Sequence, residues 1–106
     1  MVRKKIIKEL HVFRQALHKD MPVSTMILFG SRAWGKPHKD SDIDLLIISS
    51  KFKQKKSFQR ALGFRKYWHL DYPVDFLCYT PQEFKDLSSK VTLVKLAKEK
   101  GIEIKA

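Results

Sequence analysis

The first stretch of the chain repeats apolar positions at the period of an α-helix. Between residues 3 and 19 the apolar side chains stand three or four positions apart: Ile6, Leu10, Phe13 and Leu17. A stripe of this kind predicts an amphipathic helix that buries one face. Pro22 should end the helix, because the residue before a proline is pushed away from helical angles.

Three short apolar segments without a helical period follow, at residues 23–29, 43–48 and 74–79. Their length and their content of β-branched residues predict buried strands. Between the first two, residues 31–41 contain Gly35, so we expect a short helical turn followed by a loop.

The segment between the second and third predicted strands is polar. Residues 51–56 are predicted to form a solvated basic connector, and Ser57 is a suitable cap for a helix that runs to about Leu70. After the third strand, Thr80 and Pro81 are a suitable cap and first position for a further helix.

The end of the chain predicts helix and then a short strand. Residues 82–100 should form one or two helices, interrupted near Ser88 and Ser89, either of which could cap the second. Gly101 should end the last helix, and residues 102–104 could add an edge strand. The whole order predicts an α/β (α+β) fold, a small mixed sheet of three to four strands flanked by helices.

Length and composition predict one compact domain over residues 1–106. The chain is 43% apolar, which is enough for a core. A single cysteine, Cys78, excludes an intrachain disulfide framework and a cysteine-based zinc site. Apolar runs such as residues 26–29 are far too short to cross a bilayer, and the basic N-terminus lacks the apolar core of a signal peptide. We therefore expect a cytoplasmic protein that does not enter membranes.

The net charge of +11 first suggests nucleic acid as a partner. The excess is confined to two segments, however: residues 1–19 carry +5 and residues 51–70 carry +7, whereas residues 20–50 carry −1 and residues 71–106 are balanced. Because the nearly neutral centre contains the most distinctive carboxylates, charge is the weaker indication of function.

Residues 28–48 combine the features of a phosphate site and a metal site. The first predicted strand ends in Gly30 and Ser31, where glycine lets the backbone approach a ligand and a following helix start offers N–H groups to an anion. Asp42 and Asp44 begin the next strand, whose alternation places both carboxylates on one side. Two neighbouring carboxylates repel each other unless a cation joins them, and Mg²⁺ prefers such oxygen ligands.

Asp75 lies within the third predicted strand, where an unpaired charge is costly. A neighbouring strand could bring it beside Asp42 and Asp44 and complete a two-metal site. Each part also has an ordinary structural interpretation, because Gly-Ser is commonly a turn, Asp-x-Asp a solvated strand start and Asp75 a surface residue of an edge strand. Their combination in this order indicates a functional site more strongly than any part alone.

The spacing of these residues carries a family resemblance. The pattern is Gly30-Ser31, ten residues, then Asp42-x-Asp44. It is reinforced by Arg32, Ala33, Gly35, Ser41, the apolar residues 45–48 and the strand-borne aspartate segment 74–77. In these features the chain resembles the minimal nucleotidyltransferases of the DNA polymerase-beta superfamily, which implies a polymerase-beta-type nucleotidyltransferase fold.

The resemblance implies a role for each matching residue. Asp42 and Asp44 would hold the metal ions that bridge the nucleotide phosphates. Asp75 would complete the acceptor-side metal and help to activate the attacking hydroxyl. The nucleotide-binding residues implied in the same way are Gly30, Ser31, Arg32 and Ser41.

The resemblance also implies a reaction and a partner. The reaction would be Mg²⁺-dependent transfer, with two metal ions, of AMP from ATP to a hydroxyl acceptor. Small family members resemble antitoxins of helical HEPN-type ribonuclease toxins, so the acceptor would be a tyrosine of such a partner. The alternatives are a non-catalytic module that neutralises a partner by contact alone, and an RNA-binding adaptor that uses the basic segment from Lys51 to Lys56. The intact set of three carboxylates favours the enzyme.

Overall fold

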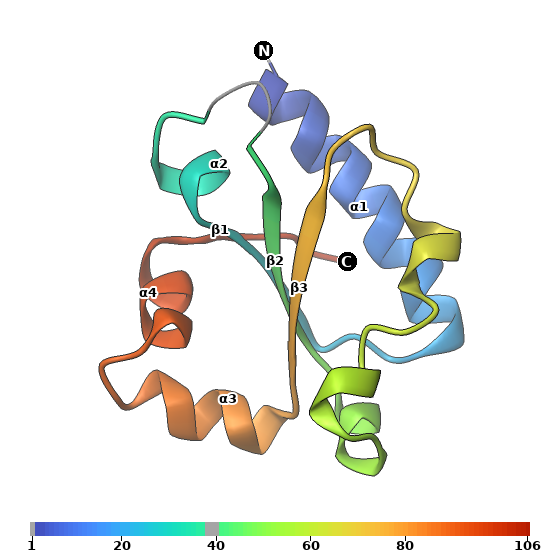
Figure 1. Ribbon diagram of the computed structural model, residues 1–106, viewed down its shortest axis with the longest axis vertical. Coiled ribbons are helices and arrows are strands. Elements are labelled where there is room, and N and C mark those ends of the chain that lie inside the picture. The colour runs from blue at the N-terminus through green and yellow to red at the C-terminus, as the bar shows by residue number, and fades with distance from the viewer. Residues whose placement is uncertain (1, 38–40) are drawn as a thin grey trace.

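A mixed four-stranded sheet forms the centre of the fold (Figure 1). The computed structural model describes residues 2–37 and 41–106. The strands lie in the order β3-β2-β1-β4, with these bounds: β1 (Thr25–Phe29), β2 (Ile43–Ile48), β3 (Val74–Tyr79) and β4 (Ile102–Glu103). β2 runs parallel to β3 and antiparallel to β1, which also pairs antiparallel with β4. The α/β class is confirmed, as are the bounds predicted for β2 and β3.

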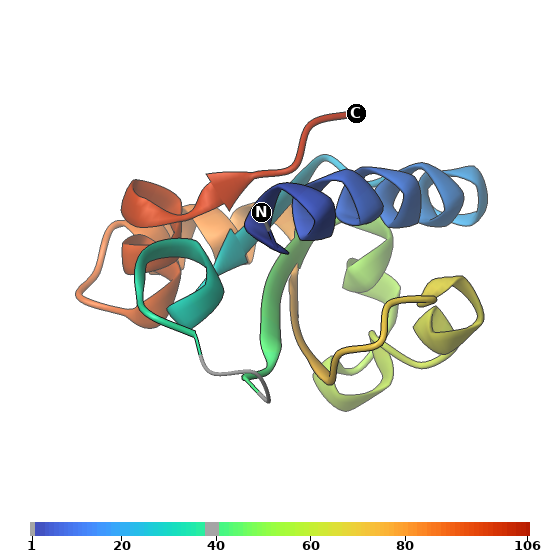
Figure 2. The same ribbon diagram turned by 90° about the horizontal axis from the view of Figure 1, so that it is seen from above.

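The helix α1 (Val2–Asp20) covers one face of the sheet (Figure 2). All four members of its predicted apolar stripe are at most 2% exposed: Ile6, Leu10, Phe13 and Leu17. Phe13 stacks on Phe76 of β3 at 5.8 Å between ring centroids. The helix is followed by a tight connection in which the Val23 N–H donates to His18 Nδ1 at 2.9 Å. The amphipathic helix predicted for this segment is thus confirmed.

The opposite face is covered by α3 (Pro81–Ser88) and α4 (Leu93–Lys100). Thr80 caps α3 as predicted, because its hydroxyl accepts from the Glu83 N–H and the Glu83 carboxylate accepts from the Thr80 N–H. The prediction that Ser88 or Ser89 caps the next helix is wrong. Their hydroxyls donate to carbonyls of the preceding turn, and Thr92 caps α4 instead by accepting from the Lys95 N–H at 3.1 Å.

The predicted helix from Ser57 to about Leu70 is also wrong. Residues 50–70, here called the basic lobe, form three one-turn 3-10 helices instead: η1 (Ser50–Gln54), η2 (Ser57–Gln59) and η3 (Phe64–Tyr67). Gly63, with a positive φ of 90°, breaks the helical path before η3. The connector predicted for residues 51–56 is only partly solvated, because Phe52 inserts into the core and is fully buried.

The two faces of the sheet bury two separate hydrophobic cores. α1 and the basic lobe share one core with the sheet, and α3 and α4 form a second core on the other face. Beyond α4, which ends at Gly101, β4 pairs with β1 and confirms the predicted edge strand. Within residues 2–37 and 41–106, every helix falls short of the length and apolarity that a membrane span requires.

Candidate active site

A sharp turn at Gly30 joins β1 to the single-turn helix α2 (Ser31–Trp34). Gly30 has a positive φ of 78°, a conformation in which a side chain is strained. A Cβ at this position would also overlap the carboxylate of Asp44. The N–H groups of Ala33 and Trp34 donate to the Gly30 carbonyl at 2.9 and 3.1 Å and close the turn. Glycine is therefore required both by the backbone and by the closeness of Asp44.

The three predicted aspartates share one face at this edge of the sheet. Asp44 and Asp75 are register partners in the parallel pair of β2 and β3, so their side chains lie side by side about one strand spacing, ~4.8 Å, apart. Asp42 lies just before β2, two residues before Asp44, and its charge acts on the Asp44 carboxyl. Further along β2 this side is buried under α4 at Leu46 and Ile48. The aspartates thus lie where the cover of α3 and α4 ends.

Asp44 is the electrostatic centre of the group. It is half-buried, whereas Asp42 and Asp75 are exposed. Burial raises the pKa of the Asp44 carboxyl, and the negative charges of Asp75 and Asp42 raise it further. Both causes act against the ionised form, so a cation at this face would relieve them.

The donor set is that of a hard divalent cation. Three carboxylates on one face offer the oxygen ligands that Mg²⁺ takes together with substrate phosphates. Among the residues that the structure describes, no three His, Cys, Asp or Glu side chains converge closely enough to hold a metal ion as they stand. Because Asp42 and Asp75 are exposed, their side chains have room to turn toward Asp44. The residues present therefore fit the ion in chemical type, and Asp42 and Asp75 would have to turn toward Asp44 to complete the site.

Arg32 is placed behind the turn rather than toward solvent. Its side chain is buried, its Nε donates to the Ser41 carbonyl at 3.0 Å, and its guanidinium lies 4.5 Å from the centroid of the Tyr72 ring. These contacts tie α2 to the residue before Asp42 and to the connection that leads into β3. The predicted contact of Arg32 with phosphate stays a prediction. The stack on Tyr72 has no signal in the sequence, because nothing there pairs two residues forty positions apart.

Comparison with known proteins places this geometry in a family. Residues 5–103 match the nucleotidyltransferase domain family. The chain belongs to the nucleotidyltransferase family. It is 32% identical over 105 residues to a Haemophilus influenzae protein named as a probable protein adenylyltransferase, MntA, in an alignment that covers 91% of this chain and 86% of that protein.

A solved structure supports the same assignment. The fold resembles the crystal structure of a Sulfolobus solfataricus protein assigned as a nucleotidyltransferase, with a TM-score of 0.64 and 25% identity over 79% of this chain and 74% of the other. The resemblance to minimal nucleotidyltransferases is therefore confirmed, and the protein is an enzyme of the nucleotidyl-transferring class.

Ser31 is half-buried in α2, and His38, Lys39 and Asp40 lie outside the described residues.

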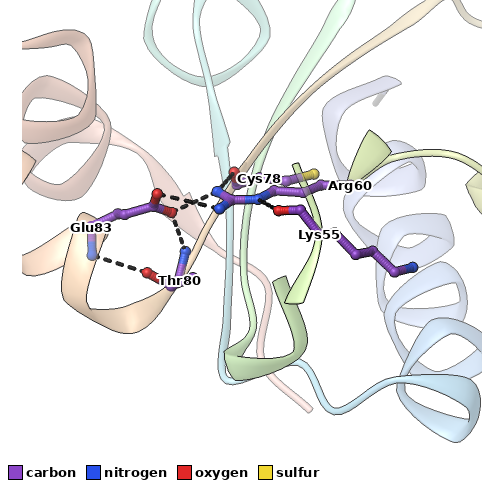
Figure 3. A network of polar contacts seen from close by, with 5 residues as sticks. All are labelled: Lys55, Arg60, Cys78, Thr80 and Glu83. Atoms are coloured by element: carbon purple, nitrogen blue, oxygen red, sulfur yellow. Dashed lines mark hydrogen bonds and ion pairs between the residues drawn. The ribbon is translucent and has the colours of Figure 1, made fainter. Parts of the chain in front are cut away.

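A second polar cluster fixes the far end of β3 in the nucleotidyltransferase (Figure 3). Arg60 of the basic lobe is buried and donates to the Cys78 carbonyl at 3.1 Å and to both carboxylate oxygens of Glu83 at 2.6 and 3.3 Å. Its Nε also donates to the Lys55 carbonyl at 3.3 Å. Since Glu83 simultaneously completes the cap at Thr80, one arginine holds the lobe, β3 and α3 together. In the sequence, nothing distinguishes Arg60 from the other six cations of residues 51–70.

The Cys78 thiol lies beside this cluster and is partly buried. Burial raises the pKa of Cys78 to about 12, against a smaller lowering by the Arg60 charge. The thiol is therefore protonated at neutral pH and is not a nucleophile. Cys78 is a small residue that packs against the core.

Proposed function

We propose that this nucleotidyltransferase transfers AMP from ATP to a tyrosine hydroxyl of a partner protein, using Mg²⁺ bound by Asp42, Asp44 and Asp75. The observation that carries the proposal is the parallel register of Asp44 with Asp75, beside a glycine turn that leaves no room for a side chain next to Asp44. Packing does not require this arrangement, because it sets three like charges on one face.

The phosphate end of the nucleotide is assigned to the turn after β1. Gly30 brings the backbone close to Asp44, and Ser31 adds a hydroxyl at the start of α2. Arg32 keeps α2 and Ser41 at a fixed separation through its buried hydrogen bond. The turn and the aspartates are thereby held as one unit, which is what positioning a triphosphate requires.

Mg²⁺ bound by these aspartates would supply a Lewis acid that neutralises charge on the phosphates as it develops. Asp42 and Asp44 would hold the ion and so orient the α-phosphate. Asp75 is exposed on the neighbouring strand, and we assign it to the acceptor side of the site. It accepts the proton of the attacking hydroxyl on a carboxylate oxygen.

The reaction is an in-line displacement at the α-phosphorus. The acceptor oxygen forms a bond to phosphorus, the bond from phosphorus to the bridging oxygen breaks, and the electron pair leaves with pyrophosphate. The product is an AMP phosphodiester of the acceptor. Because little covalent work falls to the protein, positioning and charge neutralisation supply the catalysis.

A protein acceptor is supported by the relative from Haemophilus influenzae, whose name describes a protein adenylyltransferase. We assign as partner a helical HEPN-type ribonuclease toxin and as role that of its antitoxin. Attachment of AMP to a tyrosine of that partner would inactivate the toxin.

The test joins label transfer to neutralisation of the partner. The partner is incubated with ATP labelled at the α-phosphorus, MgCl₂ and either the wild type or the Asp42→Asn/Asp44→Asn variant, and its ribonuclease activity is then measured. Asp86→Asn, an equal kind of charge change on an exposed position of α3, is the control. We expect label and neutralisation with the wild type and the control, and neither with the double variant.

Two results would contradict the proposal. Equal neutralisation by wild type and double variant without label would show that contact alone inactivates the partner. Mass spectrometry could instead locate the label on lysine or serine, with the tyrosines unmodified. That result would support transferase activity but contradict the assignment of tyrosine as the acceptor.

A further inference from the structure

The basic lobe carries a charge excess that the catalytic site does not use. Six of its cations are exposed, and residues 51–70 contain no acid: the six are Lys51, Lys53, Lys55, Lys56, Arg65 and Lys66. Arg60 is the exception, because it is buried and paired with Glu83. Packing of the lobe therefore needs one of the seven cations. The other six repel one another, which lowers stability unless an anion is bound.

Three of these cations, Lys51, Lys55 and Lys66, line a cavity between the lobe and the end of α1. The cavity has a volume of about 310 Å³ and a floor that includes Leu17, Met21 and Phe64. Lys51 and Lys55 stand on its rim. The rim also contains Lys66, which pairs with Asp20 at 3.3 Å between two exposed side chains. Asp20, the acid of the cavity lining, is therefore paired with Lys66, and Lys51 and Lys55 are available to bind an anion.

Exposed apolar side chains accompany the charge. Phe58 is 75% exposed and Leu62 is 69% exposed, and both belong to the same lobe. Leu62 lies on the cavity rim beside Tyr67, whose ring faces the Lys66 ammonium at 5.1 Å. An aromatic ring exposed among lysines offers what an unpaired base requires, a flat surface to stack on and cations for its phosphates.

The lobe lies far from the aspartates. β2 carries Asp44 at its start and leads directly into Ser49 and η1 at its other end, a separation of about 20 Å for six residues of strand. In Figure 1 the start of β2 lies at the top of the sheet, whereas η1 and η2 lie below its other end and η3 lies to the right, beside α1. A ligand on the lobe therefore leaves the candidate active site open.

From these observations we propose that the basic lobe is a binding groove for single-stranded RNA. Phosphates contact Lys51 and Lys55 at the cavity rim, and an unstacked base lies on Phe58. A duplex is excluded as the preferred ligand because its bases are already stacked and cannot reach the Phe58 ring. The proposal does not depend on the transfer reaction.

The test is fluorescence anisotropy of the full chain with a labelled single-stranded oligouridylate over a range of salt concentrations. The Lys51→Gln/Lys55→Gln variant should bind about tenfold or more weakly at low salt. The slope of log affinity against log salt should fall by about 1.4, or ~0.7 for each phosphate that the variant no longer neutralises. The control is Lys4→Gln/Lys8→Gln, which removes equal charge from exposed positions of α1. We expect the control to bind with nearly the affinity of the wild type.

The stacking contact is tested separately. Phe58→Ser should weaken binding by about 5- to 150-fold, the value for one base on an aromatic ring, and Phe58→Tyr should restore it. Because Phe58 is exposed, neither substitution should change the melting temperature. Asp44→Asn should bind RNA like the wild type, which separates this site from the proposed transferase chemistry.

Several outcomes would overturn the proposal. Equal losses in the two double-lysine variants would show attraction by net charge alone. Equal affinity for duplex and single-stranded RNA would remove the base contact. Binding to vesicles of anionic lipid with no RNA binding at the same salt would assign the groove to a membrane surface.

Discussion

At the scale of single residues, Gly30 and Gly63 show how a positive φ serves two purposes, although ψ differs between them, −159° at Gly30 and −8° at Gly63. Both have positive φ, 78° and 90°. A Cβ at Gly63 would meet nothing within 4 Å, whereas one at Gly30 would collide with the Asp44 carboxylate. Gly63 is therefore needed for its turn alone, and Gly30 for the turn and for the aspartate.

Substitution of the two glycines separates these effects. Gly63→Ala should cost about 1 kcal/mol of unfolding free energy from backbone strain, and Gly30→Ala about 1–3 kcal/mol because the displaced carboxylate adds to it. Gly30→Ala should also lower nucleotidyl transfer about 100-fold, the effect of a small misplacement at a reacting centre. Urea unfolding and a transfer assay measure both. Equal transfer by the two alanine variants would show that Asp44 is not held by the turn.

The ionised Asp44 carboxylate lowers the stability of the fold, and we attribute its presence to the proposed metal site. Burial and two neighbouring carboxylates all oppose its ionised form. Asp44→Asn should therefore raise the melting temperature in EDTA by about 2–6 °C. MgCl₂ with ATP should raise the melting temperature of the wild type and leave that of Asp44→Asn unchanged, because only the wild type gains a cation among the carboxylates.

Thermal unfolding of Asp86→Asn, with its exposed carboxylate, serves as the control for the loss of one charge. The melting temperature of Asp44→Asn in EDTA could instead lie below that of the wild type. That result would mean that a neighbouring group in the fold stabilises the Asp44 carboxylate, and that the three carboxylates do not repel one another.

At the scale of elements, local patterns predicted most of the fold. β2 and β3 begin and end as expected, because each is an apolar run bounded by polar or turn residues. The face shared by Asp42 and Asp44 follows from alternation, and their place beside Asp75 from a parallel neighbour. The sequence could not show that register, which depends on how the strands dock.

The basic lobe departs from its predicted helix for a physical reason. Phe58 and Leu62 stand four positions apart, as on one face of a helix, yet both are exposed and Gly63 interrupts the turn. Arg60 reaches Glu83 across 23 positions, and this long-range pair, together with the burial of Phe52, sets the path of the chain. Contacts of that separation leave no periodic signal.

The clamp between Arg60 and Glu83 gives a pH-dependent stability. The hydrogen bond from Arg60 is the main cause that lowers the Glu83 pKa below its ordinary value of 4.5. A lowered carboxyl pKa stabilises the fold above pH 4.5, and this contribution is lost as the pH falls through the lower value of the folded state. Because the Glu83 side chain is 42% exposed, solvent screens the pair and we expect about 1 kcal/mol at neutral pH.

The measurement is the melting temperature of Glu83→Gln across pH. It should lie a few degrees below that of the wild type at pH 7, and the gap should close as the pH falls below about 4. Glu99→Gln, an exposed position of α4, is the matched control and should show almost no gap. A gap for Glu83→Gln that stays constant with pH would assign the loss to the helix cap rather than to the charge of the carboxylate.

At the scale of the whole molecule, the net charge of +11 conceals two groups of charged residues to which we assign different functions. The three aspartates Asp42, Asp44 and Asp75 lie where β2 and β3 begin. The exposed cations of the basic lobe follow the other end of β2. The sheet thus separates a candidate site for a metal and nucleotide from a candidate site for an anionic polymer. Total charge alone indicates the second and conceals the first.

The central claim is that the three aspartates direct chemistry to the α-phosphorus of the nucleotide. The most direct measurement compares ATP labelled at the α-phosphorus with ATP labelled at the γ-phosphorus, each incubated with MgCl₂, the enzyme and its protein acceptor. We predict label on the acceptor from the α-position alone, abolished by Asp42→Asn/Asp44→Asn and kept with Asp86→Asn. Label from the γ-position, or unchanged α-label with the double variant, would contradict the claim.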